Sequence, residues 1–279
     1  MDKNYRSEIF SWYTELRNLI CQEFEKIEEE YAQVHKNTPG KFQRKKWDRP
    51  GGGGGVMSVM KGEVFEKVGV NISEVHGEFS DEFKSQIPGT GDDAKFYACG
   101  ISLVAHMKSP LVPSVHMNTR FIETSRWWFG GGMDLTPAIE FSEDSKDWHQ
   151  ANQQACDKHD PKYYPKFKKQ CDEYFHIKHR GEARGIGGTF YDYHNSGNMD
   201  DDFAFTQDIG KAFLEVFPKL VRRRMNEKWT QKQKEKQLIK RGRYAEFNLL
   251  YDRGTKFGLM TDGNVEAILM SMPPEAKWP

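Results

Sequence analysis

The feature that most constrains the fold is a series of short runs in which apolar and polar side chains alternate. Runs of this kind lie at residues 56–60, 100–106, 112–121, 126–135 and 185–193. Successive side chains of a β-strand point to opposite faces of a sheet, so this period of two predicts strands. The C-terminal part adds three strand-like runs with short turns between them, at residues 244–252, 256–262 and 265–272. Closely spaced strands predict an antiparallel meander rather than a β-α-β arrangement.

Other segments carry the three- and four-residue spacing of amphipathic helices. In residues 6–35 the recurring apolar residues are Ile9, Trp12, Leu16, Ile20, Phe24 and Ile27. Residues 143–180 and 202–238 are also predicted to be helical. Residues 37–56 contain proline, glycine and basic residues without periodicity, which predicts a loop. Because there is no internal repeat and no long linker, we expect one α+β domain over residues 1–279.

Composition excludes several classes of protein. The 41 lysine and arginine residues balance 41 aspartate and glutamate residues, so no overall field draws the chain to nucleic acid. The apolar runs are shorter than the ~18 residues that span a bilayer, and the N-terminus lacks a secretory signal. No CxxC pair is present, so we expect free thiols in a reducing cytoplasm. The four cysteines are Cys21, Cys99, Cys156 and Cys171.

Three glycine runs stand out, at residues 51–55, 130–132 and 185–188. None has the spacing of a phosphate-binding loop or of a dinucleotide fingerprint. A glycine run forms a flexible linker, or it lets a ligand or a second backbone approach closely. The run at 130–132 lies inside a strand pattern, between bulky aromatic residues and Asp134. There we favour the wall of a pocket with one acid in it.

The histidines allow two interpretations. A metal site built from His106, His116, His149 and His179 is one, although no pair has HxxxH spacing. Satisfied core or surface histidines are the other. His116 is distinctive because Asn118 and Arg120 follow it at period two, which places all three side chains on one face of a strand.

Arginines in or beside the strand-like runs also allow two interpretations. Arginine is rarely buried without a partner, so internal ion pairs with Asp134, Asp192, Glu246 or Asp252 are one explanation. Bidentate binding of ligand carboxylates is the other. The arginines in question are Arg120, Arg184, Arg243 and Arg253.

Seven segments together resemble one family, the oxygen-dependent coproporphyrinogen-III oxidases, and most closely its bacterial cytosolic members. They lie at residues 47–54, 64–77, 115–121, 127–137, 178–193, 241–259 and 267–274. The resemblance implies a large antiparallel sheet covered on both faces by helices. It also implies a homodimer, to which residues 244–279 contribute contacts.

The implied reaction is the oxidative decarboxylation of two propionates of coproporphyrinogen III to vinyl groups, giving protoporphyrinogen IX in haem biosynthesis. Dioxygen is the co-substrate, no organic cofactor takes part, and a divalent metal such as Mn²⁺ is described for some members. The resemblance assigns catalysis to His116, Asp134, Asp252 and Arg253. It assigns substrate binding to Ser102, Asn118, Arg120, Arg184, Asp262, Gly263 and Asn264. The positions that match proposed metal ligands are His106, His116, His149 and His179.

In this interpretation Asp134 or Asp252 accepts hydrogen bonds from pyrrole NH groups, and His116 donates or accepts a proton. The glycines at 130–132 would let the macrocycle lie against bare backbone. Two other functions remain open from the sequence: a metal-dependent hydrolase or oxygenase that uses the four histidines, and a tetrapyrrole carrier without catalysis.

Overall fold

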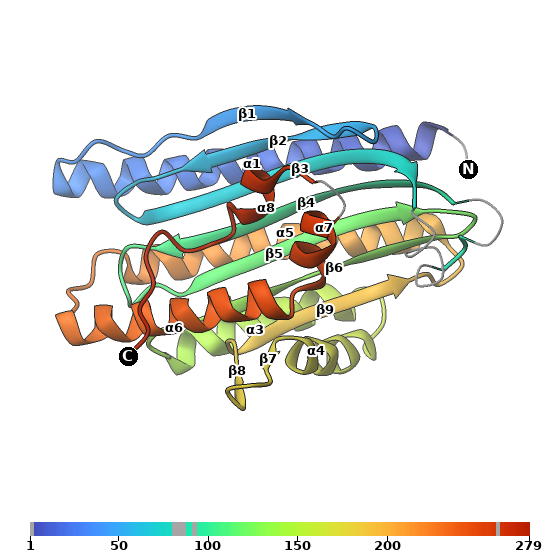
Figure 1. Cartoon of the computed structure of the whole chain (residues 1–279). Helices are drawn as coiled ribbons and strands as arrows, with labels where there is room; N and C mark the ends of the chain where they lie inside the picture. Colours follow the sequence, from blue (N-terminus) through green and yellow to red (C-terminus); the bar gives the residue numbers. More distant parts are fainter. Residues whose placement is uncertain (1–2, 80–87, 91–93, 261–262) are drawn as a thin grey trace.

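A seven-stranded antiparallel sheet forms the centre of the computed structural model, which describes residues 3–79, 88–90, 94–260 and 263–279 (Figure 1). The strand order is β1-β2-β3-β4-β5-β6-β9, so each strand but the last lies beside its neighbour in sequence. The strands are β1 (Gln43–Asp48), β2 (Gly53–Met60), β3 (Phe65–Glu78), β4 (Lys95–Met107), β5 (Ser114–Glu123), β6 (Trp127–Thr136) and β9 (Gly187–His194). The strands predicted from the period of two all lie in this sheet.

Helices cover both faces of the sheet (Figure 1). On one face, α1 contacts β3 and β4, α5 contacts β5 and β6, and α3 and α4 contact β9. On the other face lie α6, α7 and α8. The helices are α1 (Lys3–His35), α3 (Ser142–Asp157), α4 (Tyr163–Tyr174), α5 (Met199–Arg224), α6 (Gln231–Leu250), α7 (Arg253–Met260) and α8 (Val265–Leu269). The α+β fold, with one large antiparallel sheet, is therefore confirmed.

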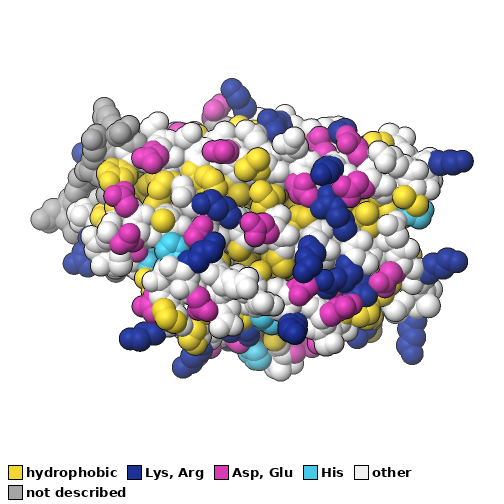
Figure 2. All heavy atoms as spheres, turned by 180° about the vertical axis from the view of Figure 1, so that it is seen from behind, with side chains coloured by type: hydrophobic (Ala, Val, Ile, Leu, Met, Phe, Trp, Pro, Cys, Tyr) yellow, Lys and Arg dark blue, Asp and Glu magenta, His cyan; other side chains and the backbone are white. Residues whose placement is uncertain are grey.

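The main core lies between the sheet and the α1/α5 layer. The apolar face of α1 is fully buried there, and Phe24 stacks on Phe65 of β3 with 4.5 Å between ring centroids. From α5, Phe213 and Phe217 complete this aromatic group. The outer surface of this layer carries acidic and basic side chains that are interspersed, with apolar side chains between them (Figure 2). No helix in the described part of the chain is long and apolar enough to cross a membrane.

Side-chain alternation in β5 separates this core from the opposite face. Met117, Thr119 and Phe121 are buried on the face covered by α1 and α5. His116, Asn118 and Arg120 lie on the other face and are only partly buried. The prediction that these last three residues share a face is confirmed.

The predicted C-terminal meander is wrong, because residues 244–250 continue α6 and the two following runs contain α7 and α8. Thr230 is the N-cap of α6 and forms a capping box with Gln233, so the first turn of the helix is fixed well before the strand-like run at 244–252. Tyr244 and Phe247 are buried at the spacing of three that suits a helix, but Phe247, Leu249 and Tyr251 also recur at the spacing of two that suits a strand. Short apolar runs do not separate the two structures by periodicity alone.

The loop predicted for residues 37–56 is also wrong in part, because it contains β1 and the start of β2. The predicted helical segment at 143–180 ends at Tyr174, and a small hairpin of β7 (His176–Ile177) and β8 (Glu182–Ala183) follows. The segment at 202–238 is divided between two helices, α5 and α6. Helix α5 begins at Asn198, whose side chain accepts hydrogen bonds from two backbone N–H groups.

Candidate active site

A deep cavity of about 800 Å³ lies between the free face of the sheet and the layer of α6, α7 and α8. Its volume falls within the ~300–1,000 Å³ typical of ligand pockets. The strands β3, β4 and β5 supply the floor, and Tyr244, Asp252, Arg253 and Asn264 of the helical layer line the opposite side.

The antiparallel register arranges the floor in rows that cross the strands. One row is almost without side chains in its middle, since Gly55, Ser73 and Gly100 are register partners on three adjacent strands. Trp47 of β1 ends this row on one side and Arg120 of β5 on the other. The next row is polar and consists of Asn71, Ser102 and Asn118. A flat ligand could therefore lie on the bare row with hydrogen-bonding groups along one edge.

One chain of hydrogen bonds and ion pairs connects the floor to the helices. Its order is Arg253, Asp192, Arg120, Asn118, His116, Asp134, Arg184 and Asn248. Six of these eight residues were predicted site residues. Asp192 was foreseen only as an ion-pair partner, and Asn248 was missed. Asn248 gave no signal of its own, because an amide on a predicted strand has no defined partner.

His116 and Asp134 form the centre of this chain. They are register partners on β5 and β6, and the His116 Nδ1 atom lies 2.7 Å from Asp134 Oδ1. The Asn118 amide nitrogen lies 2.9 Å from His116 Nε2. A neutral ring with its proton on Nδ1 satisfies both contacts, because Nδ1 then donates to the carboxylate and Nε2 accepts from the amide. The carboxylate thus orients the ring.

Asp134 lies beneath the cavity wall. It is 1% exposed, and the Arg184 Nη2 atom donates to its two oxygens at 2.8 and 2.7 Å. Burial by itself would raise the pKa of Asp134, but the Arg184 guanidinium and the His116 ring outweigh burial and leave the pKa below its ordinary value. Asp134 is therefore an anion whose oxygens are already engaged, which does not favour the predicted contact with pyrrole NH groups.

Arg184 is buried in the same way. Its Nη1 atom donates to Asn248 at 3.0 Å, and its guanidinium lies 4.0 Å from the centroid of Phe175 and 4.6 Å from that of Tyr244. Burial opposes the charge, but Asp134 raises the pKa of Arg184 above its ordinary value. The ion-pair explanation of this arginine is the one that the structure shows.

Asp192 of β9 joins the two arginines that reach the cavity. Its Oδ1 atom accepts from Arg120 Nη2 at 2.7 Å, and its Oδ2 atom lies 3.1 Å from Arg253 Nη2. The side chain of Arg120 is 32% exposed and that of Arg253 is 55% exposed, so both guanidinium groups keep donors free for a ligand. Ion pairing and ligand binding are therefore compatible here. Arg243, in contrast, lies in α6 and pairs with Glu182 and Glu246.

Asp252 and Arg253 both line the cavity at the start of α7, as expected of neighbours in a turn. The Asp252 Oδ1 atom accepts from the Tyr174 hydroxyl at 2.9 Å, and Oδ2 accepts from the Thr255 N–H at 2.7 Å. Asp252 thereby caps α7. Burial, followed by the charge of Asp252, raises the pKa of Tyr174 to about 12, so this phenol stays protonated and donates.

The glycines at 130–132 are required by neighbouring protein atoms. A Cβ atom on Gly130 would lie 2.9 Å from Arg120 Nη2 and 3.0 Å from Asp192 Oδ1. On Gly132, whose φ is +146°, it would lie 2.0 Å from the Thr189 carbonyl oxygen. Neither glycine is among the residues that line the cavity, which differs from the predicted floor of bare backbone. The bare part of the floor lies instead at Gly100, because the Trp47 indole covers Gly55.

The remaining predicted binding residues lie in different places. Ser102 belongs to the polar row of the floor, and Gly263 and Asn264 line the helical side. Asn264 also caps α8 through a hydrogen bond from the Ala267 N–H at 2.9 Å. Asp262 lies outside the described residues.

The four histidines that were predicted as metal ligands have separate hydrogen-bond partners. His106 contacts the Ser271 carbonyl, His149 the Tyr164 hydroxyl, and His179 contacts both Tyr251 and Glu246. In the described part of the chain, no three His, Cys, Asp or Glu side chains are grouped to hold a metal ion. Each of the four histidines is thus held by a different partner, and the shared metal site stays a prediction.

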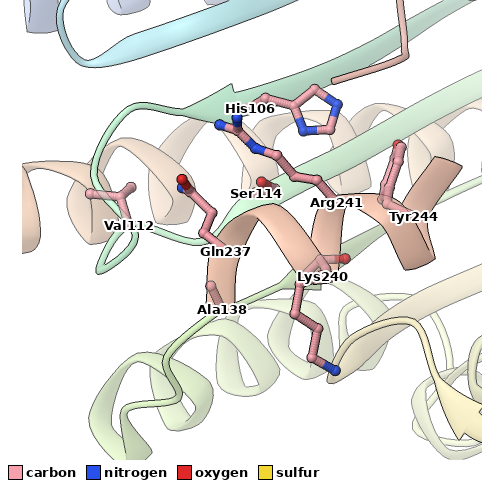
Figure 3. A pocket seen from close by; sticks show the side chains of 9 residues that line it. His106, Val112, Ser114, Ala138, Gln237, Lys240, Arg241 and Tyr244 are labelled. Atoms are coloured by element: carbon pink, nitrogen blue, oxygen red, sulfur yellow. The ribbon is translucent and has the colours of Figure 1, made fainter. Parts of the chain in front are cut away.

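His106 illustrates the alternative of a core histidine, which here is held through one of its two ring nitrogens. It lies with Gln237, Arg241 and Tyr244 of α6 around a small pocket of about 10 Å³, the size of one water molecule (Figure 3). Burial lowers the pKa of His106 to about 3, so the ring is neutral. Its Nε2 atom lies 2.9 Å from the Ser271 carbonyl oxygen and so connects the C-terminal segment to β4.

Fold and site together define the class: an α+β protein with one deep cavity whose free arginines suit a flat ligand that bears carboxylates. A family model described as coproporphyrinogen III oxidase matches residues 8–279. The chain is 66% identical over 278 residues, 100% of both chains, to a Rickettsia bellii (strain OSU 85-389) protein named oxygen-dependent coproporphyrinogen-III oxidase. A protein of the same name from Rickettsia akari (strain Hartford) is 67% identical over 268 residues, 96% of each chain. The chain therefore belongs to the coproporphyrinogen III oxidase family, as the sequence motifs indicated.

Proposed function

We propose that this chain catalyses the oxygen-dependent oxidative decarboxylation of two propionate groups of coproporphyrinogen III, which gives protoporphyrinogen IX. The observation that carries the proposal is the hydrogen-bonded chain on the floor of the cavity. It presents an oriented imidazole and two partly free guanidinium groups beside a flat row that can hold a macrocycle. Family membership along the whole chain supports it.

Each step removes two electrons and one carboxyl group from a propionic acid side chain. The bond between the Cα atom and the carboxyl carbon breaks, carbon dioxide leaves, and a C=C bond forms as the neighbouring carbon loses hydrogen. Dioxygen takes up the two electrons and two protons and leaves as hydrogen peroxide. The reaction balances without an organic cofactor.

His116 is the proposed proton donor or acceptor, and general acid–base help of this kind contributes ~10²–10⁴ in rate. Arg120 and Arg253 are the proposed partners of substrate carboxylates, because their guanidinium groups reach the cavity. Asp134 and Arg184 act through His116 by holding its ring in place. Asp192 and Asp252 both line the cavity, but Asp192 pairs with Arg120 and Arg253. We assign the contact with pyrrole NH groups to Asp252, because this carboxylate is partly exposed and keeps acceptor positions beyond its bonds to Tyr174 and Thr255.

Three further points belong to the proposal. Dioxygen is the co-substrate, and a divalent metal ion such as Mn²⁺ is a candidate cofactor whose participation the chelator arm of the test decides. A homodimer is supported by exposed apolar side chains in residues 244–279, among them Leu250 and Met260. A cytoplasmic location is supported by the four cysteines, which are all buried and free.

The test is oxygen uptake by the purified chain with coproporphyrinogen III, with and without a chelator, combined with detection of the divinyl product. We expect one dioxygen consumed per vinyl group formed, with and without chelator. Binding of the macrocycle without oxygen uptake would instead identify a tetrapyrrole carrier. Activity abolished by the chelator and restored by Mn²⁺ would identify a metal-dependent oxygenase.

A further inference from the structure

Arg184 lines the cavity but is buried against Asp134, and Lys256 lines it one turn after Arg253. The other arginines of the lining lie at two separate ends. Arg120 and Arg253 lie at the β5–β9 end, where Asp192 neutralises one of their two charges. Arg49 lies at the opposite end, directly after β1. The Arg49 guanidinium reaches the His76 carbonyl of β3 and the Phe96 ring of β4. Phe96 lies four residues before Gly100, the register partner of Arg120, so the two ends are ~14 Å apart along the strands.

Arg49 is held in position by a carbonyl group and an aromatic ring. Its Nη1 atom donates to the His76 carbonyl oxygen at 3.3 Å, and its guanidinium lies 5.6 Å from the centroid of Phe96. No ion pair between Arg49 and an Asp or Glu side chain occurs among the residues that the structure describes. A carbonyl and an aromatic ring orient the guanidinium but do not neutralise it, so its charge remains available to a ligand.

The surroundings of Arg49 are shaped for a flat ring. Trp47 lies flat against the next strand, since a Cβ atom on Gly55 would lie 2.5 Å from its indole ring. The indole Nε1–H donates to Asn71 at 3.0 Å, which fixes the ring at the edge of the bare row. The glycine run at 51–55 thus serves the cavity: two of its members adopt positive φ at the turn, and Gly55 makes room for Trp47.

We infer that Arg49, with Trp47 beside it, forms a second carboxylate-binding end of the cavity, which holds a propionate on the edge of the macrocycle opposite to the one at Arg120 and Arg253. The inference rests on the proposed function. Coproporphyrinogen carries carboxylates around its whole rim, and cations at one end alone would leave the far carboxylates unpaired. Arg49, which has no acidic partner in the described part of the chain, supplies a positive charge where they would lie.

The experiment compares Arg49→Gln and Arg49→Lys with Arg44→Gln, a control on the same strand whose guanidinium contacts Asn18 outside the cavity. The probes are coproporphyrin III, an oxidised and unreactive tetracarboxylate, and the neutral tetraamide of the same macrocycle. Binding is measured by fluorescence titration at low and high salt, and circular dichroism verifies the fold of each variant.

We expect Arg49→Gln to weaken coproporphyrin III binding ~10–100-fold, the loss typical of one charge-assisted contact, with a smaller loss for Arg49→Lys. The affinity of Arg49→Gln for the tetraamide should change little. High salt should narrow the difference in coproporphyrin III affinity between variant and wild type. Arg44→Gln should bind both probes as the wild type does. Equal losses for both probes, or a change below twofold for coproporphyrin III, would overturn the inference.

Oxygen uptake by the wild-type chain separates this result from the proposed function. If the wild type turns over coproporphyrinogen III and Arg49→Gln binds coproporphyrin III normally, the inference of a second carboxylate-binding end is wrong, whereas the proposed function stands. If the wild type binds coproporphyrin III through Arg49 but consumes no oxygen, the binding site stands and the catalytic function is wrong.

Discussion

Asp134 and Arg184 form a buried ion pair that positions a third residue, His116. Both are almost fully buried, and their contact with each other holds the imidazole of His116 through one carboxylate oxygen. Removing one partner of such a pair leaves the other charge uncompensated in the interior. A substitution here therefore acts on stability as well as on the orientation of His116.

We expect Asp134→Asn to lower the free energy of unfolding by about 3–5 kcal/mol, because Arg184 keeps its charge. Turnover by the remaining folded protein should fall at least ~10²-fold, because the ring of His116 loses its anionic partner. Denaturant titration measures the first effect, and oxygen uptake per folded molecule, from circular dichroism, measures the second. Wild-type turnover per folded molecule would remove Asp134 from the mechanism.

At the scale of elements, Glu28 connects α1 to the turn that precedes β3. Its carboxylate is 1% exposed and has no basic partner among the described residues. Instead it accepts hydrogen bonds from four backbone N–H groups, those of Gly40, Glu63, Val64 and Phe65. These bonds satisfy donors that the turn would otherwise bury unpaired. One side chain thus fixes where the strand begins relative to the longest helix.

We expect Glu28→Gln to lower the free energy of unfolding by about 2–3 kcal/mol, since its hydrogen bonds lose the anionic acceptor and one amide hydrogen faces the N–H groups. Glu29→Gln is the matched control, because Glu29 is exposed and pairs with Lys41 at the surface. The Glu29→Gln substitution should change the free energy of unfolding by less than ~1 kcal/mol. Equal effects of the two substitutions in denaturant titrations would contradict the role of Glu28.

At the scale of the whole molecule, Glu246 of α6 contacts residues from segments that are distant in sequence. Its carboxylate accepts from Arg180 at 2.6 Å, from Trp278 Nε1 at 2.8 Å, and lies 2.8 Å from His179 Nε2. The hydrogen bond from Arg180 is the main reason that the pKa of Glu246 falls to about 2. The hairpin of β7 and β8 and the C-terminus are therefore joined to the helical layer through one anion.

Because the folded pKa of Glu246 lies below the ~4.3 of an unfolded chain, its contribution to stability is fully present above about pH 4.3. It is lost as the pH falls from there toward about 2. We expect Glu246→Gln to be less stable than the wild type at neutral pH and to lose less stability on acidification. Denaturation midpoints measured over this pH range provide the test; parallel curves for the two proteins would disprove it.

The proposed homodimer is also a property of the whole molecule. Exposed apolar side chains gather in the last helices, with Leu249 52%, Leu250 49%, Leu259 40%, Met260 64% and Val265 55% exposed. We expect light scattering to give twice the mass of one chain, and Leu250→Asp to shift the protein toward the monomer. A wild-type monomer at all concentrations would show that this surface does not bind a second copy.

The sequence by itself determined the features that depend on neighbours along the chain. Alternation in residues 112–121 predicted that His116, Asn118 and Arg120 share a face, because strand geometry alone sets that direction. The three- and four-residue spacing of apolar side chains in residues 6–35 predicted α1, because helix geometry alone places such side chains on one face. Motif order indicated the family before any contact was known.

Only the tertiary structure decided which distant groups meet. The register of β5 and β6 opposes His116 and Asp134, and β9 brings Asp192 between two arginines. The histidines predicted to share a metal lie on separate elements, and residues 244–250 continue a helix that began at Thr230. Ion pairs and hydrogen bonds between distant residues depend on strand register and helix packing, and neither is encoded in the local periodicity of the chain.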